Sequence, residues 1–292
     1  MARGCVPLVR LVRCMSILFR NNVRIAGRGE HVLVFGHGFG CDQTMWRFVA
    51  PAFEATHRVV LFDFVGAGGS DLRAYDSARY DTLQGYATDV LEVLDAVGAR
   101  PVVFVGHSVA STIGMLAAAR RPSWFARLVH VAPSPCFLND PPLYHGGFAR
   151  ADLLGLLEMM DQNFRGWAHA LAPMVAGTDH RPEYTAEIEA RFCAFDPIIA
   201  RQFAEVTFLS DHREDVPLVP VPSLILQCAD DAIAPESVGQ WLAHHLPQST
   251  YHALAATGHC PHLTEPAETI AAIRAYLETD AGLPMHDLAG VE

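Results

Sequence analysis

Six short apolar runs rich in branched side chains recur along the chain and predict strands of a buried sheet. They lie at residues 31–35, 58–62, 102–105, 128–131, 223–227 and 251–254. Segments with helical periodicity separate most of these runs, at residues 83–97, 111–120, 237–246 and 267–277. Alternating strands and helices are typical of a mostly parallel sheet covered on both faces. We therefore expect an α/β fold.

The alternation of strands and helices stops between Pro133 and about Val216. This stretch has helical periodicity at residues 152–163, 184–192 and 197–209 and no clear strand pattern. A helical block inserted between two strands predicts a cap over the carboxyl edge of the sheet, where ligands bind in such folds. Helices that only add packing are the alternative interpretation. We expect a core formed by residues 15–132 and 217–280, a helical cap at 133–216 and a C-terminal tail at 281–292.

Composition narrows the possible functions. The chain has 292 residues, 51% of them hydrophobic, and a net charge of −11, which argues against a nucleic-acid or anionic-membrane partner. All 21 basic residues are arginine, so a Schiff-base, pyridoxal-phosphate or Walker A lysine is excluded. The seven cysteines lack CxxC spacing, which favours reduced thiols over a disulfide framework. We expect a cytoplasmic protein without a cofactor.

The N-terminal segment is basic and is interrupted by charge. The first 24 residues hold five arginines and no acid, and Arg10 and Arg13 break the apolar run. This pattern is not that of a secretory signal, and no stretch approaches the ~18 apolar residues that a membrane span needs. Met15 opens a segment more typical of a folded protein. We therefore predict that residues 1–14 are a disordered leader.

The strongest chemical signal is the sequence Gly106-His107-Ser108-Val109-Ala110. It follows the apolar run 102–105 and precedes the predicted helix 111–120. A serine at a sharp strand-to-helix turn is the nucleophile elbow of serine hydrolases, which needs glycine at position 106 and a small residue at 110. Ala110 stands where the motif usually has a second glycine. Such a motif also arises by chance, but its position between a strand and a helix favours Ser108 as a nucleophile.

A serine nucleophile needs a histidine base, and that histidine needs an acid to orient it. In this arrangement the chain order is serine, acid, histidine. His259 lies in a loop after the last predicted strand and is the predicted base; a structural or surface histidine is the alternative. Asp230 and Asp231 follow the run 223–227, and Asp231 is favoured because it stands four residues before Pro235. Asp230 is then a solvated neighbour.

Acyl transfer also needs donors for the developing oxyanion, usually two backbone N–H groups. The predicted donors are the N–H groups of Val109 and of Phe39, the latter in the turn Gly36-His37-Gly38-Phe39-Gly40. The ring of Phe39 is expected to face the pocket.

Two further patterns are interpreted as structural. The glycines at 66–69 fail the G-x-G-x-x-G register of dinucleotide sites, and His259-Cys260-Pro261-His262 lacks the second ligand pair of a metal site.

Several segments resemble the RsbQ-like family of bacterial α/β-hydrolases, which act upstream of the general-stress sigma factor sigma-B. The segments are GHGFGCDQTMW (36–46), RVVLFDFVGAGGSDLRAYD (58–76), VFVGHSV (103–109), PSPCFLNDPP (133–142), ARQFAEVTFLSDHRED (200–215), LILQCADDAIAP (224–235) and GHCPHL (258–263). The resemblance runs from Met15 to about Leu277. The chain is more distantly similar to plant karrikin and strigolactone receptors.

The resemblance implies an α/β-hydrolase fold with a mostly parallel sheet and an inserted helical cap. It implies Ser108, Asp231 and His259 as the catalytic triad and Phe39 and Val109 as the oxyanion-hole donors. It also implies a hydrophobic cavity under the cap, with substrate-binding aromatic residues at Phe39, Phe137, Phe148, Trp167 and Phe208. A PAS-domain serine phosphatase is the implied partner.

The sequence therefore predicts a serine hydrolase that attacks the ester or lactone of a small hydrophobic molecule, a carboxylic ester hydrolase of class EC 3.1.1, in stress-response signalling. Two alternatives stay open. One is a small-molecule receptor with slow or no turnover. The other is a metabolic esterase or enol-lactonase without a protein partner.

Overall fold

Seven strands form one sheet in the computed structural model, which describes residues 14, 16–177 and 182–279. The strand order is β1-β3-β2-β4-β5-β6-β7. The strands are β1 (Arg24–Ala26), β2 (His31–Gly36), β3 (His57–Leu61), β4 (Val102–His107), β5 (Phe125–Val131), β6 (Ser223–Asp230) and β7 (Ser249–Thr257). All neighbouring pairs are parallel except β1 with β3. The predicted mostly parallel sheet is confirmed, and each predicted apolar run overlaps one of its strands.

Strand β1 was missed by the sequence interpretation. It has three residues and pairs antiparallel with β3 at the edge of the sheet, with Arg24 opposite Leu61. Its residues are exposed or half-buried, so no run of buried branched side chains marks it. The pairing partner lies far along the chain, and a pattern within β1 itself could not reveal it.

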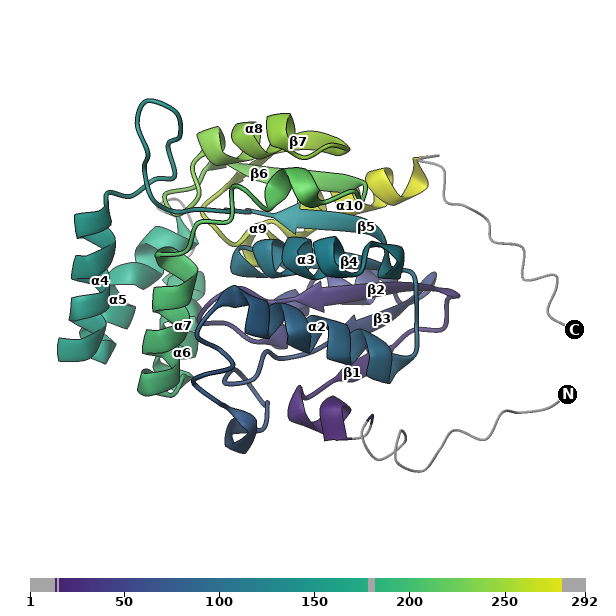
Figure 1. Ribbon diagram of the computed structural model, residues 1–292, viewed down its shortest axis with the longest axis horizontal. Helices are drawn as coiled ribbons and strands as arrows, with labels where there is room; N and C mark the ends of the chain where they lie inside the picture. The colour runs from purple at the N-terminus through teal and green to yellow at the C-terminus, as the bar shows by residue number, and fades with distance from the viewer. Residues whose placement is uncertain (1–13, 15, 178–181, 280–292) are drawn as a thin grey trace, which may run out of the picture.

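Helices cover both faces of the sheet (Figure 1). One face carries α2 (Leu83–Val97), α3 (Val109–Arg120) and α8 (Glu236–His245), whose apolar side chains belong to the larger hydrophobic core. The other face carries α10 (Pro266–Glu278) and the one-turn helices η1 (Gln43–Trp46) and η2 (Ala50–Phe53). The short helix α9 (Pro261–Thr264) precedes α10. The sheet is therefore buried on both faces, which explains its near-continuous apolar strands.

Four helices follow β5 and gather at one end of the sheet, at the left of Figure 1. They are α4 (Arg150–Gln162), α5 (Phe164–Ala176), α6 (Pro182–Ala194) and α7 (Pro197–Phe208). Ion pairs join α6 to the region of η1, with Arg191 Nη1 2.8 Å from Asp42 Oδ2 and Arg47 Nη2 2.7 Å from Glu187 Oε2. We call these four helices the cap helices.

Helix α5 was not predicted, and the predicted helix 152–163 ran one residue too far. Asn163 is the C-cap of α4 and also the N-cap of α5. Its side-chain oxygen accepts a hydrogen bond from the Gly166 N–H at 2.9 Å. Gly166 and Pro173 inside α5 weaken its helical pattern. The N-cap asparagine followed by apolar residues at helical spacing was the signal that could have identified α5.

The predicted tail, and the predicted leader apart from Cys14, fall outside the part of the chain that the structure describes. Residues 1–13 and 281–292 lie outside the described residues. Among the helices that are described, none combines the length and the apolar character that crossing a membrane requires.

Candidate active site

Ser108 lies on a strained turn between β4 and α3. Its backbone has φ 54° and ψ −123°, and its N–H donates to the Val131 carbonyl at 2.9 Å. A Cβ at position 106 would lie 2.6 Å from the Ala110 carbonyl oxygen, so the turn requires Gly106. A Cβ on Gly36 would lie 3.1 Å from the Cβ of Ala110. Alanine is accommodated at position 110 because position 36 is glycine.

The structure brings Ser108, His259 and Asp231 into one hydrogen-bonded chain. His259 Nε2 lies 2.7 Å from Ser108 Oγ, and His259 Nδ1 lies 2.7 Å from Asp231 Oδ2. Asp231 Oδ1 accepts hydrogen bonds from the backbone N–H groups of Ile233 at 2.8 Å and Ala234 at 3.0 Å. All three side chains are buried. In this geometry the imidazole can take the serine proton while the carboxylate holds its Nδ1–H.

Backbone contacts hold the loop that carries His259. The Gly258 N–H donates to the carbonyl of Asp230, and the His259 N–H donates to the carbonyl of Val175 at 2.9 Å. Gly258 has φ +75°, and a Cβ there would lie 2.4 Å from the Ala176 carbonyl oxygen. The side chain of Asp230 is exposed, whereas that of Asp231 is buried. The last turn of α5, a cap helix, thus positions the backbone of His259.

The two predicted oxyanion donors belong to separate segments of the chain. Val109 is the first residue of α3, so its N–H belongs to the helical amides that have no carbonyl partner within the helix. Phe39 follows Gly38 in the loop after β2. The ring of His37 braces this loop: Nδ1 contacts the Gly38 carbonyl at 2.9 Å, and Nε2 accepts from the Phe64 N–H at 3.1 Å. Burial lowers the pKa of His37, which favours this neutral form.

His107 links the serine turn to the histidine loop. Its Nε2 lies 2.8 Å from the backbone carbonyl of His259, so Nε2 carries the proton and donates. The ring packs against Gly38 of the oxyanion loop, where a Cβ would approach His107 Nδ1 to 2.5 Å, and its centroid lies 4.3 Å from that of His262. Burial lowers the pKa of His107 well below its usual range. One neutral imidazole, next to Ser108 in the chain, therefore contacts both the loop of His259 and the loop of Phe39.

Because several histidines are buried in their neutral form, we expect the free energy of unfolding to decrease in acid. Burial lowers the pKa of His130 on β5 to about 3, and both its ring nitrogens lack a partner among the described residues. Below pH 6.5 the unfolded chain takes up a proton that the folded His130 does not, so stability falls as pH falls. Between pH 7 and 5 this one group removes about 2 kcal/mol of the free energy of unfolding. The free energy of unfolding, measured with urea at pH 7 and pH 5, should therefore decrease less in His130→Leu than in the unaltered protein, by about 2 kcal/mol.

The control for this experiment is His252→Gln, which removes an exposed imidazole instead of a buried one. A His130→Leu protein with the full pH dependence of the unaltered chain would contradict the prediction.

A small cavity of about 30 Å³ lies beside Ser108, with room for little more than a water molecule. Side chains from the core loops and from the cap helices α5, α6 and α7 enclose it. Its lining residues are Phe39, Cys41, His107, Ser108, Leu171, Val175, Phe192, Thr207, Phe208, Ile233, His259 and Cys260. Because ligand sites usually measure about 300–1,000 Å³, a substrate must displace some of these side chains.

The cavity differs from the predicted pocket in its lining residues. Phe39 and Phe208 line the cavity, but Phe137, Phe148 and Trp167 are not among its lining residues. Phe137 packs edge-on against Phe208 with centroids 5.2 Å apart, and Trp167 packs edge-on against Phe39 at 6.0 Å. The rings of Phe137 and Trp167 thus pack against lining residues and do not line the cavity themselves. The sequence interpretation did not name the lining residues Leu171 and Val175 of α5 or Phe192 of α6.

Two cysteines of the lining are neutral thiols. Burial raises the pKa of Cys41 to about 12 and the pKa of Cys260 well above its usual range. Since the thiolate is the reactive form, neither thiol competes with Ser108 as a nucleophile at neutral pH.

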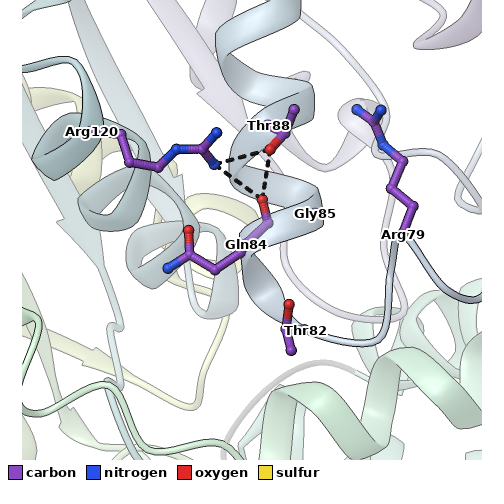
Figure 2. Close-up of a pocket in the computed structure, with 6 residues that line it drawn as sticks. All are labelled: Arg79, Thr82, Gln84, Gly85, Thr88 and Arg120. Atoms are coloured by element: carbon purple, nitrogen blue, oxygen red, sulfur yellow. Dashed lines mark hydrogen bonds between the residues drawn. The ribbon is translucent and has the colours of Figure 1, made fainter.

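A larger groove of about 370 Å³ lies elsewhere, over the first turns of α2 (Figure 2). Both arginines of its lining have partners: Arg120 Nη1 donates to Thr88 Oγ1 at 2.9 Å within the groove (Figure 2), and Arg79 pairs with Asp89 and Glu92 outside it. The groove is open to solvent and brings no nucleophile next to a base. The hydrogen-bonded chain at Ser108 is therefore the candidate active site.

Comparison with known proteins finds a matching family model and related chains. A model of the alpha/beta hydrolase family matches residues 33–273. Strigolactone esterase D14 of Arabidopsis thaliana is 38% identical over 254 residues, which are 87% of this chain and 94% of that protein. Karrikin insensitive 2 receptor CA of Petunia hybrida is 36% identical over 264 residues, which are 90% of this chain and 97% of that protein.

A solved structure is similar over nearly the whole chain. It is a hydrolase from Oleispira antarctica, which superimposes with a TM-score of 0.90 at 41% sequence identity and covers 91% of this chain and 98% of that one. The relatives thus include proteins named as esterases, hydrolases and receptors.

Proposed function

Because this chain belongs to the alpha/beta hydrolase family, we propose that it is a serine hydrolase of class EC 3.1.1 acting on the ester or lactone of a small, uncharged, hydrophobic molecule. The observation that carries the proposal is the chain of two 2.7 Å hydrogen bonds from Ser108 through His259 to Asp231. The apolar lining beside Ser108 supports the substrate class.

In the proposed mechanism His259 Nε2 takes the proton of Ser108 as Oγ attacks the ester carbonyl. The oxyanion that forms accepts hydrogen bonds from the N–H groups of Val109 and Phe39. Collapse of the tetrahedral intermediate breaks the C–O bond, and the leaving alcohol takes the proton from His259. Water then attacks the acyl-serine with His259 again as base, which releases the acid and restores Ser108. Asp231 stays ionised throughout and stabilises the imidazolium.

The lining predicts a preference for uncharged acyl chains. A substrate carboxylate would leave water without a cationic partner in the cavity, and that desolvation would go uncompensated. We expect kcat/KM for p-nitrophenyl butyrate to exceed that for the p-nitrophenyl monoester of succinate by about 10²-fold or more. Both esters share the leaving group, so the ratio isolates the acyl chain. A preference for the succinate monoester would contradict the proposed pocket.

A receptor function is the second candidate. The observations that favour it are the small cavity, which a ligand must open, and the identity of 36% to a karrikin insensitive 2 receptor. Steady turnover of short esters supports the enzyme. A burst of one product per protein followed by very slow release would favour the receptor.

The cellular location and the protein partner are predicted from the sequence alone. A cytoplasmic location and a PAS-domain serine phosphatase partner stay predictions from composition and from the resemblance to the RsbQ-like family. The relatives named above are esterases, hydrolases and receptors, and none of their names includes a phosphatase partner.

A further inference from the structure

Thr207 carries a buried hydroxyl that nothing in the described part of the chain satisfies. Its side chain lies on the last turn of α7 and is 3% exposed, and Oγ1 has no hydrogen-bond partner among the described residues. Threonine in a helix commonly donates to the carbonyl three or four residues earlier. Thr207 does not, and buried hydroxyls without a partner are rare in folded proteins.

The hydroxyl of Thr207 lies in the wall of the candidate active site. Thr207 lines the same cavity as Ser108 and His259, on the side formed by the cap helices. Ser108 and His259 bond to each other, and His107 donates through Nε2 to the His259 carbonyl. The other ring nitrogen of His107, Nδ1, has no partner among the described residues, but it packs against Gly38. Valine would fill the same volume without an unpaired oxygen, so packing alone does not call for threonine here.

We propose that Thr207 is a specificity-determining residue whose hydroxyl binds a second oxygen atom of the substrate, apart from the carbonyl that Ser108 attacks. The substrate class is therefore an uncharged ester or lactone that carries an ether, carbonyl or hydroxyl oxygen elsewhere in the molecule. A threonine hydroxyl can donate to the first two and accept from the third. This inference rests on the proposed function of Ser108 as nucleophile.

The test compares pairs of p-nitrophenyl esters that differ by one atom. In each pair an ether oxygen replaces one methylene: methoxyacetate with butyrate, 3-methoxypropanoate with pentanoate, and 4-methoxybutanoate with hexanoate. The measured quantity is kcat/KM for the ether ester divided by kcat/KM for its hydrocarbon partner. This ratio is determined for each protein and compared between proteins. Comparison between proteins cancels the intrinsic reactivity of each ester.

For at least one pair we expect Thr207→Val to lower this ratio about 10-fold, the effect of losing one hydrogen bond to the substrate. Thr207→Ser retains a hydroxyl and should keep the ratio within about twofold. The matched control is Thr269→Val on α10, a buried threonine whose hydroxyl donates to the Glu265 carbonyl away from the cavity, and its ratio should equal that of the unaltered protein. Equal ratios for Thr207→Val and the unaltered protein in all three pairs would overturn the proposal.

Failure of the serine-hydrolase proposal would give a different result from failure of the Thr207 proposal. If the unaltered protein hydrolyses none of the six esters, the serine-hydrolase proposal fails and the Thr207 proposal is decided by binding. Thermal stabilisation by the same esters is then measured for the unaltered protein and for Thr207→Val. Stronger stabilisation by an ether ester than by its hydrocarbon partner, lost on this substitution, supports the hydroxyl contact. The same stabilisation in both proteins refutes it.

Discussion

Replacing Ser108 by alanine is expected to lower ester hydrolysis by about 10³-fold or more and to abolish covalent labelling by an organophosphorus reagent. The reason is that Ser108 places its hydroxyl 2.7 Å from His259 Nε2 on a turn that exposes it to the cavity. The neighbouring thiols of Cys41 and Cys260 are protonated and cannot replace it. Hydrolysis of p-nitrophenyl butyrate and mass spectrometry of the labelled protein measure the two effects.

The control for this experiment is Ser237→Ala on α8, which removes a hydroxyl that lies outside the cavity and bonds to the His145 carbonyl. It should retain both activity and labelling. Labelling that persists in Ser108→Ala would show that another residue is the nucleophile.

Asp231→Asn is expected to lower kcat by about 10³-fold, nearly as much as loss of the serine. In the structure Oδ1 of Asp231 accepts from two backbone N–H groups, so an asparagine keeps its carbonyl oxygen there and turns its NH₂ toward His259. His259 Nδ1 must then accept, which places the imidazole proton on Nε2. An Nε2–H cannot take the proton of Ser108, and the base is lost.

Asp230→Asn is the matched control for the acid. Its side chain is exposed, and the contact it makes with the histidine loop uses its backbone carbonyl, which the substitution keeps. We expect kcat within about threefold of the unaltered protein, since a solvated surface carboxylate contributes little. If Asp230→Asn were the more damaging of the two, the orienting acid would be Asp230.

Local patterns in the sequence were sufficient to predict most of the helices and strands of the fold. The helix predicted at 83–97 has the observed bounds of α2, since an apolar stripe and Gly98 with φ +68° define its face and its end. The buried strands were found because their side chains meet apolar neighbours on both faces. Strand β1 and helix α5 were missed because an exposed edge pairing and a helix weakened by Gly166 and Pro173 carry weak local signals.

The sequence by itself determined which residue types could form a nucleophile, base and acid, and their order along the chain. Only the tertiary structure decided that Asp231 and not Asp230 reaches His259, and that Ser108 meets a histidine 151 positions away. It alone decided which side chains enclose the cavity, and Phe137, Phe148 and Trp167 are not among them. The physical reason is range: periodicity reports how a segment meets its own surroundings, whereas a site depends on distances between segments that only packing brings together.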